Sequence, residues 1–232
     1  MNHHDASLLA TFKTTTDFGV KYAADFPTTG IAGQQFALVT SAVTQSETLG
    51  ATQVAGVGQK HSGAISLAAA RVQLHDDLVA IARAAHSLTL LGTDGLKGKF
   101  ALSHNNSNQA LINAANAFVT DATPLAAQMI GVGLPGDFIA HLTADIATFQ
   151  AAISTKTAGA GVQAGATGAL ADAMHKAAIA LHVLQSIVPN VYKNDAAKLA
   201  EWATASHVQK HTPVPHPQPA SATAATATPA KT

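Results

Sequence analysis

The sequence contains no cysteine and has few charged or aromatic residues. Of its 232 residues, 5% are aromatic and 11% are charged, against about 25% charged in an average soluble domain. The lack of cysteine excludes a disulfide scaffold, an iron–sulfur protein, a zinc-thiolate site and covalently attached haem. There are 13 basic and 13 acidic residues, so the net charge is zero. We therefore expect no nucleic-acid binding of the basic-patch kind.

A long apolar run is also missing. The strongest candidate, residues 179–188, is interrupted by His182, Gln185 and Ser186, so the sequence predicts no membrane span. The first residues, 1–5, lack a basic segment followed by a continuous apolar stretch, and we expect no signal peptide. The cytoplasm is then the default location.

Apolar residues recur at helical spacing along most of the chain, and strand-like alternation is nowhere sustained. Steps of three and four residues place apolar side chains on one face of an α-helix. The clearest rows are Leu111, Ala115, Phe118, Ala122, Leu125 and Met129; Ile139, Leu142, Ile146, Phe149 and Ile153; Leu170, Met174, Ala177, Leu181, Leu184 and Val188. A fourth row, of Leu67, Leu74, Ile81 and Leu88, repeats every seven residues. The pattern predicts an all-α protein.

Glycine and proline divide this pattern into separate helices. The predicted helices cover residues 6–24, 30–54, 62–91, 107–130, 135–155, 167–188 and 194–209. We place stops at Gly56 and Gly58, at the glycines of residues 159–168 and before Pro189, and a kink at Pro124. The prediction is an antiparallel helix bundle of six or seven helices over residues 1–211.

The end of the chain differs in composition. Residues 212–232 hold Pro213, Pro215, Pro217 and Pro219 followed by an alanine–threonine run. Since large apolar side chains are lacking after Val214, this segment cannot build a core. It predicts a polyproline-type spacer and a disordered C-terminal tail.

The predicted helix 62–91 carries a second apolar row. Ile65, Val72 and Val79 lie away from the row that runs from Leu67 to Leu88. A helix that is apolar on two sides is either central in its bundle or meets another subunit. We favour the central position, and a homo-oligomer formed through this helix is the alternative.

Histidine is unusually frequent, at 12 residues. Asp137, His141 and Asp145 follow one another at four-residue spacing, so all three project from one helix face and could bind a divalent metal. An exposed, ion-paired face is the alternative that we favour, because the apolar row of that helix lies elsewhere.

The other histidine pairs point less clearly to a site. His175 and His182 are about 10.5 Å apart along a helix, too far to share one metal, although each could be a haem axial ligand or bond a polar neighbour. His75 and His86 share a helix face that we interpret as solvated. His207 and His211 have chelating spacing, and with His216 they could bind nickel or zinc adventitiously.

No catalytic motif is present. Only Glu47 and Glu201 are glutamates, and neither is followed by a histidine three residues later, which excludes a ferritin-like di-iron bundle. Metalloprotease, nucleophile-elbow and phosphate-loop motifs are all missing. We therefore predict no catalytic residue and no cofactor, and an enzyme is the less favoured reading.

Several short motifs resemble those of a group of uncharacterised bacterial all-helical proteins. They are Asp25-Phe26-Pro27, Lys99-Phe100, Asn108-Gln109-Ala110-Leu111 with Phe118 and Pro124, Gly133-Leu134-Pro135 with Asp137-Phe138 and Phe149, and Trp202 with His207-Val208. The resemblance covers most of residues 5–208 and departs at residues 101–104, where that group has a more basic, proline-containing segment. It implies a helical fold and brings no activity, cofactor or catalytic residue.

The sequence thus predicts a non-enzymatic structural or interaction protein that self-associates. Long helices, a two-sided helix 62–91 and 51 alanines, which let helix backbones approach closely, motivate this hypothesis. A metal- or haem-binding bundle that uses its histidine-rich faces is the alternative function.

Overall fold

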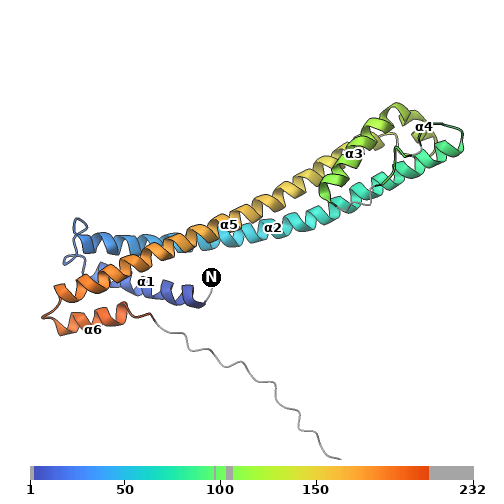
Figure 1. Ribbon diagram of the computed structural model, residues 1–232. Helices are drawn as coiled ribbons and strands as arrows, with labels where there is room; N and C mark the ends of the chain where they lie inside the picture. Colours follow the sequence, from blue (N-terminus) through green and yellow to red (C-terminus); the bar gives the residue numbers. More distant parts are fainter. Residues whose placement is uncertain (1–2, 97, 103–106, 209–232) are drawn as a thin grey trace, which may run out of the picture. The chain divides into compact units, whose positions relative to one another are not determined.

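The computed structural model describes residues 3–96, 98–102 and 107–208, and within these ranges the chain is helical and contains no strand. The all-α prediction is therefore confirmed. The elements in chain order are α1 (His3–Lys21), α2 (Ile31–Leu90), α3 (Asn108–Ala122), the 3-10 helix η1 (Thr123–Leu125), α4 (Ala126–Gly131), α5 (Phe138–Val191) and α6 (Ala196–Ala205) (Figure 1). The predicted tail, residues 212–232, lies outside the described residues.

Two helices are much longer than the sequence pattern indicates. The 60 residues of α2 cover both predicted helices 30–54 and 62–91, and the 54 residues of α5 cover both 135–155 and 167–188. The predicted stops at Gly56 and Gly58 and in residues 159–168 are wrong, and Pro189 lies inside the last turn of α5. Over the described residues the helix boundaries therefore differ from the predicted ones, and the predicted bundle of six or seven helices is not confirmed.

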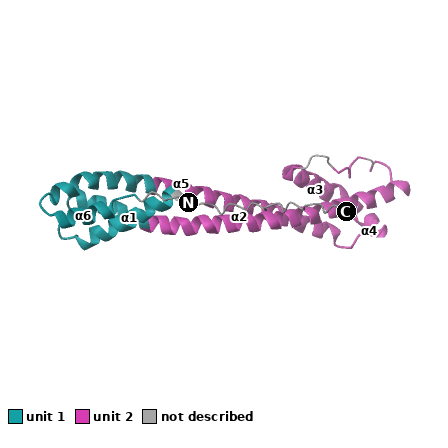
Figure 2. Ribbon diagram, turned by 90° about the horizontal axis from the view of Figure 1, so that it is seen from below, with its two compact units in different colours: residues 1–43, 174–232 teal, residues 44–173 magenta. Residues whose placement is uncertain are grey.

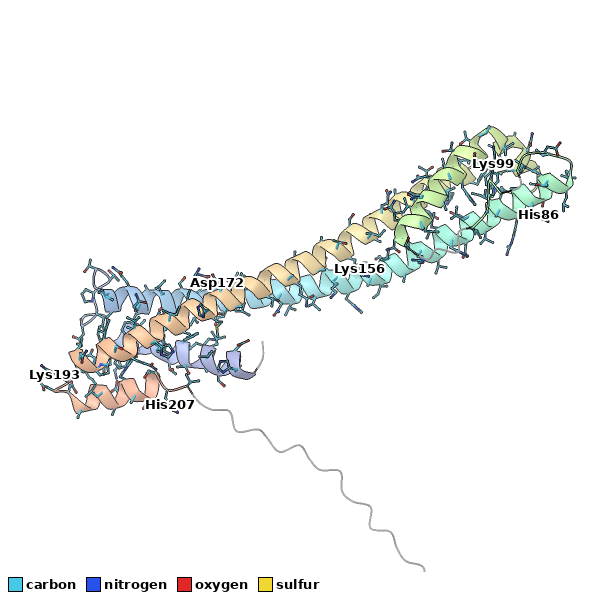
Figure 3. The ribbon with its side chains drawn as sticks, in the orientation of Figure 1. His86, Lys99, Lys156, Asp172, Lys193 and His207 are labelled. Atoms are coloured by element: carbon cyan, nitrogen blue, oxygen red, sulfur yellow. The ribbon has the colours of Figure 1, made fainter. Side chains whose placement is uncertain are left out.

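Three of the glycines inside these helices, Gly56, Gly63 and Gly159, lie where two backbones meet. A Cβ added to Gly56 would lie 2.7 Å from the Gln163 backbone nitrogen, and one added to Gly63 would lie 2.6 Å from the Lys156 backbone nitrogen. Gly159 likewise faces the backbone of Lys60; Lys156 marks this stretch of α5 (Figure 3). Residue numbers rise along α2 while they fall along α5, so the two helices run in opposite directions here. These glycines permit close contact and do not end the helices.

The chain forms two compact units, residues 1–43 with 174–232, and residues 44–173 (Figure 2). In the unit of residues 44–173, the predicted apolar rows make up the core. The side chains of Leu74, Phe118, Met129, Leu142 and Phe149 are essentially inaccessible. The row of α3 stays in phase across Pro124, but η1 replaces the predicted kink in a continuous helix.

The turns of this unit follow the glycine positions that the sequence predicts. The helix α2 ends at Leu90, and Gly92, Gly95 and Gly98 have positive φ angles of 94°, 80° and 92°. Gly133 has a φ of 107° between α4 and α5. Only glycine adopts such angles at no steric cost, so these positions reverse the chain.

The unit of residues 1–43 and 174–208 is built around aromatic side chains. Phe18 lies 5.1 Å from Trp202 between ring centroids, and Phe26 lies 5.1 Å from Phe36 and 5.6 Å from Tyr192. Aromatic rings at tilted or edge-on angles attract one another beyond their burial. Although aromatic residues are few, they concentrate in this core and join α1, α2 and α6 with Tyr192, the residue that follows α5.

A polar network closes one edge of the aromatic core. The Tyr192 hydroxyl donates to Asp25 Oδ2 at 2.7 Å, and Lys198 Nζ donates to the same oxygen at 2.9 Å. The bond from Tyr192 and then that from Lys198 lower the pKa of Asp25 below its usual value. The Lys198 ammonium also lies 4.6 Å from the centre of the Tyr192 ring, which adds a cation–π contact.

Removing the hydroxyl of Tyr192 should destabilise this edge. We expect Tyr192→Phe to lower the free energy of unfolding by about 1 kcal/mol, since the ring stays packed while Asp25 loses a donor. The matched control is Tyr22→Phe, whose hydroxyl bonds Glu201 at the surface and should matter less. Urea unfolding of both variants measures the difference, and equal losses would contradict this assignment.

Candidate functional site

One face of α2 is apolar and exposed. Val54, Ile65 and Val72 are 71%, 60% and 62% exposed. With the small or uncharged residues between them they form a continuous row, which we call the outer face: Val54, Gly58, His61, Ile65, Ala69 and Val72. The steps of four and three residues place all six on one side of the helix.

The outer face lies on the side of α2 opposite the one that contacts the rest of its unit. Gly56, Gly63, Leu67 and Leu74 occupy the contacting side and are buried. The prediction that the second apolar row is central in the bundle is therefore wrong for Ile65 and Val72. The row is exposed because helical packing covers only one side of α2 at these residues. Contact with another subunit is the alternative that remains.

The predicted metal ligands do not come together as a set. His141 Nε2 lies 3.7 Å from Asp137 Oδ2, and both side chains are about two-thirds exposed, at 67% and 66%. Asp145 instead interacts with Asp77, which lies on α2. Across the described ranges, no group of three or more histidine, aspartate or glutamate side chains is placed to hold a metal ion. A metal bound by Asp137, His141 and Asp145 stays a prediction of the sequence.

Asp77 is the residue that sequence reasoning missed. Asp77 Oδ2 and Asp145 Oδ2 are both buried, and neither oxygen has a hydrogen-bond donor. An ionised carboxylate next to another is unfavourable, because like charges repel. Burial first, and then the hydrogen bond and charge of Asp145, raise the pKa of Asp77 to about 6, while the nearby His141 lowers it.

A small cavity adjoins this carboxyl pair. It has a volume of about 310 Å³, and Asp77, Asp137 and His141 line it together with apolar side chains. The apolar wall consists of Ala80, Ile81, Leu134, Pro135 and Phe138. An acid whose pKa lies near neutrality beside a cavity can exchange a proton, but nothing here pairs it with a nucleophile.

A second cavity, of about 520 Å³, lies between α1 and α6. Its charged side chains are Asp17, Lys21 and Glu201, and the last two are joined to each other at 2.7 Å. The hydrogen bond from Lys21, followed by that from Tyr22, lowers the pKa of Glu201. An acid held ionised in this way is a poor proton donor.

The other histidines lie at the surface where the structure describes them. His182 Nδ1 is 3.2 Å from Gln185 Oε1, and His75 Nδ1 is 3.8 Å from Asp76 Oδ1. His175 and His86 are exposed, and His86 lies near the end of α2 (Figure 3). His211 and His216 lie outside the described residues. Of these surface histidines, His182 and His75 therefore have a polar neighbour in the structure.

Comparison with known proteins adds no relative. No family model, no curated protein and no solved structure matches this chain. Over residues 3–96, 98–102 and 107–208, none of the helices is both long and apolar enough to cross a membrane. Function is therefore inferred from the chain's own surfaces, among them the outer face of α2 with its exposed aliphatic side chains.

Proposed function

We propose that the protein is a non-enzymatic structural or interaction protein, built as an antiparallel helix bundle, that self-associates through the outer face of α2. The observation that supports this proposal is the row of Val54, Ile65 and Val72, each more than half exposed. Single exposed aliphatic residues are ordinary on a protein surface. A row of them along one helix face is typical of a contact with another helix.

The energetics favour pairing of this face with a copy of itself. Burying a large aliphatic side chain stabilises a complex by about 1.5–3 kcal/mol, and a two-fold contact buries each of these residues twice. The net charge of zero means that two copies do not repel each other as whole molecules. Between Val54 and Val72 the outer face itself carries no acidic or basic residue apart from His61.

The double variant Ile65→Ser/Val72→Ser tests the proposal. We expect it to weaken self-association at least about tenfold, which corresponds to about 1.4 kcal/mol, because the aliphatic row is lost. Sedimentation velocity over a concentration series measures the change. The folded unit should be unaffected, since both side chains are exposed in the single chain.

A matched control is available away from α2. Val20 on α1 and Ile179 on α5 are 70% and 52% exposed and do not belong to the outer face. The variant Val20→Ser/Ile179→Ser should associate as the unaltered protein does. Equal weakening in both double variants, or no weakening in the first, would count against the outer face as the contact.

A further inference from the structure

The cavity beside Asp77 combines acidic and apolar side chains. Asp77 and Asp137 line it together with apolar residues, of which Ile81 and Phe138 are 2% and 6% exposed and belong to the core. All the lining residues belong to one compact unit, residues 44–173. The cavity volume of about 310 Å³ lies at the lower end of the range for small-molecule sites, about 300–1,000 Å³. A small ligand therefore fits this cavity.

Asp77 has a hydrogen-bond acceptor that its described neighbours leave open. Its Oδ2 atom is buried and has no donor, and the same holds for Oδ2 of Asp145 beside it. Buried polar atoms are nearly always paired with a protein group, a water or an ion, because an unpaired one loses its hydration without compensation. An open carboxylate acceptor at a cavity thus indicates a ligand with a hydrogen to donate.

The charges around the cavity favour a ligand with a positive charge. Among the described residues that line it, Asp77 and Asp137 carry carboxyl groups, and only His141 can become cationic. Asp145 and Asp76 disfavour a negative charge on Asp77, whereas His141 favours it. A cation placed beside Asp77 would offset the repulsion among these carboxyl groups.

We propose that this cavity binds a small organic cation, namely a primary amine with an apolar body. The ammonium group lies against Asp77 and donates to its open acceptor, since an ammonium carries three hydrogens. The apolar body lies against Ile81, Leu134 and Phe138, which line the cavity. The inference does not depend on the proposed self-association.

A divalent metal ion suits this cavity less well than an amine does. Mg²⁺ and Ca²⁺ prefer about six or more oxygen ligands. In the part of the chain that the structure describes, no group of three or more histidine, aspartate or glutamate side chains is placed to hold an ion. The apolar side chains of the lining supply no ligand to a metal, whereas an amine with an aliphatic or aromatic body contacts both kinds of side chain.

Isothermal titration calorimetry of the full chain at pH 7.5 with phenethylamine and hexylamine tests the proposal. We expect saturable binding of one amine per chain. Phenethyl alcohol, which lacks the charge, and methylamine, which lacks the apolar body, should bind at least about tenfold more weakly than phenethylamine. Absence of saturable binding of both amines up to millimolar concentrations overturns the proposal, and so does binding of manganese chloride in their place.

Asp77→Asn and Asp76→Asn are the matched variants. Asp77→Asn removes the carboxylate that holds the ammonium and should weaken binding of phenethylamine at least about tenfold. The variant should stay folded, since the amide imitates a protonated carboxyl. Asp76 does not line the cavity and its side chain is 71% exposed, so Asp76→Asn should bind as the unaltered protein does. Unchanged affinity in Asp77→Asn would place the amine elsewhere and overturn the proposal.

A larger side chain at Ala80 tests whether the amine occupies the cavity itself. Ala80 lines the cavity and is half-buried, so Ala80→Leu fills part of the volume and should abolish binding of phenethylamine while Asp77 stays in place. Ala140→Leu adds the same side chain at an exposed position of α5 outside the cavity and should leave the affinity unchanged. Urea unfolding checks that both variants are folded. Undiminished binding in folded Ala80→Leu contradicts the proposal.

The affinity should also fall as the pH is lowered. Asp77, with a pKa of about 6, is mostly protonated at about pH 5, whereas an alkylammonium keeps its proton up to about pH 10. We expect binding to be about tenfold weaker at pH 5 than at pH 7.5, because the ammonium then meets a neutral carboxyl. A proton gained by His141 would act in the same direction, so the same titration of His141→Gln isolates Asp77. An affinity independent of pH in that variant contradicts the proposal.

Discussion

Alanine in place of Gly63 or Gly159 is expected to destabilise the unit of residues 44–173 by about 2–3 kcal/mol. A Cβ at Gly63 would lie 2.6 Å from the Lys156 nitrogen and 2.8 Å from its Cα, and a Cβ at Gly159 would meet the backbone of Lys60. Because these neighbours are backbone atoms, they cannot move aside as a side chain would, and the two helices must separate. Overpacking of a tight contact typically costs about 1–3 kcal/mol.

The sign of this effect distinguishes contact glycines from ordinary ones. Substitution of glycine by alanine inside an uncrowded helix stabilises the folded protein by up to about 1 kcal/mol. Gly161 and Gly165 lie on the same helix and have no atom within 4 Å of an added Cβ. We expect Gly161→Ala and Gly165→Ala to raise the unfolding midpoint while Gly63→Ala and Gly159→Ala lower it. Thermal unfolding measures these midpoints. A shift of the midpoint in the same direction in all four variants would contradict the close contact of α2 with α5.

The second large effect concerns the pH dependence of stability. The pKa of Asp77 is about 6 in the folded chain against an ordinary 3.8, so the folded state binds the proton more tightly than the unfolded state. The stabilisation from this proton is complete below about pH 3.8 and is lost as the pH rises through about 6. The contribution of Asp77 therefore falls with rising pH, opposite to that of an ion-paired carboxylate.

The variant Asp77→Asn should remove this contribution. An amide imitates the protonated carboxyl and can donate its hydrogen to Asp145 at every pH. We expect it to be more stable than the unaltered protein at pH 7.5 by about 1 kcal/mol, the usual value of a satisfied hydrogen bond, with little difference at pH 4. Urea unfolding at several pH values measures both.

An exposed neighbour provides the control. Asp76 has a side chain that is 71% exposed, so Asp76→Asn should leave the slope of stability against pH nearly unchanged. Because histidines also titrate in this range, the test is the difference between each variant and the unaltered protein. A slope in Asp77→Asn equal to that of the unaltered protein would show that the pKa of Asp77 is not raised in the folded chain.

The apolar spacing of the sequence predicted the core well. The rows that include Leu74, Phe118, Phe149 and Leu181 are buried in the two units. This succeeded because burying one face of each helix dominates the choice of core residues. The end of α2 was also predictable, since Gly92 has the positive φ that stops a helix.

The length of the helices was not predictable from the same rules. In the sequence, Gly56 and Gly159 resemble helix breakers, yet they are positions where two backbones meet. One sequence cannot distinguish these roles, because the distinction depends on a residue about 100 positions away. For the same reason, the hydrogen bonds of Asp25 with Tyr192 and Lys198 could not be predicted from the sequence.

The candidate sites were predictable only in part. The spacing of Ile65 and Val72 revealed the second apolar row on α2. It did not reveal whether that row is central in the bundle or meets another subunit. Asp77 was missed although one signal existed, since it stands between Leu74 and Leu78 on the core side of α2. Its partner Asp145 lies on α5, and only the fold brings the two together.

Native mass spectrometry of the full chain over a concentration series tests the central claim most directly. The outer face of α2 predicts a dimer whose share rises with concentration and whose mass is twice that of the chain, with nothing added. A monomer at every concentration would contradict self-association through this face. A monomer that carries the extra mass of a metal or haem would instead favour the histidine-rich faces as the functional surface.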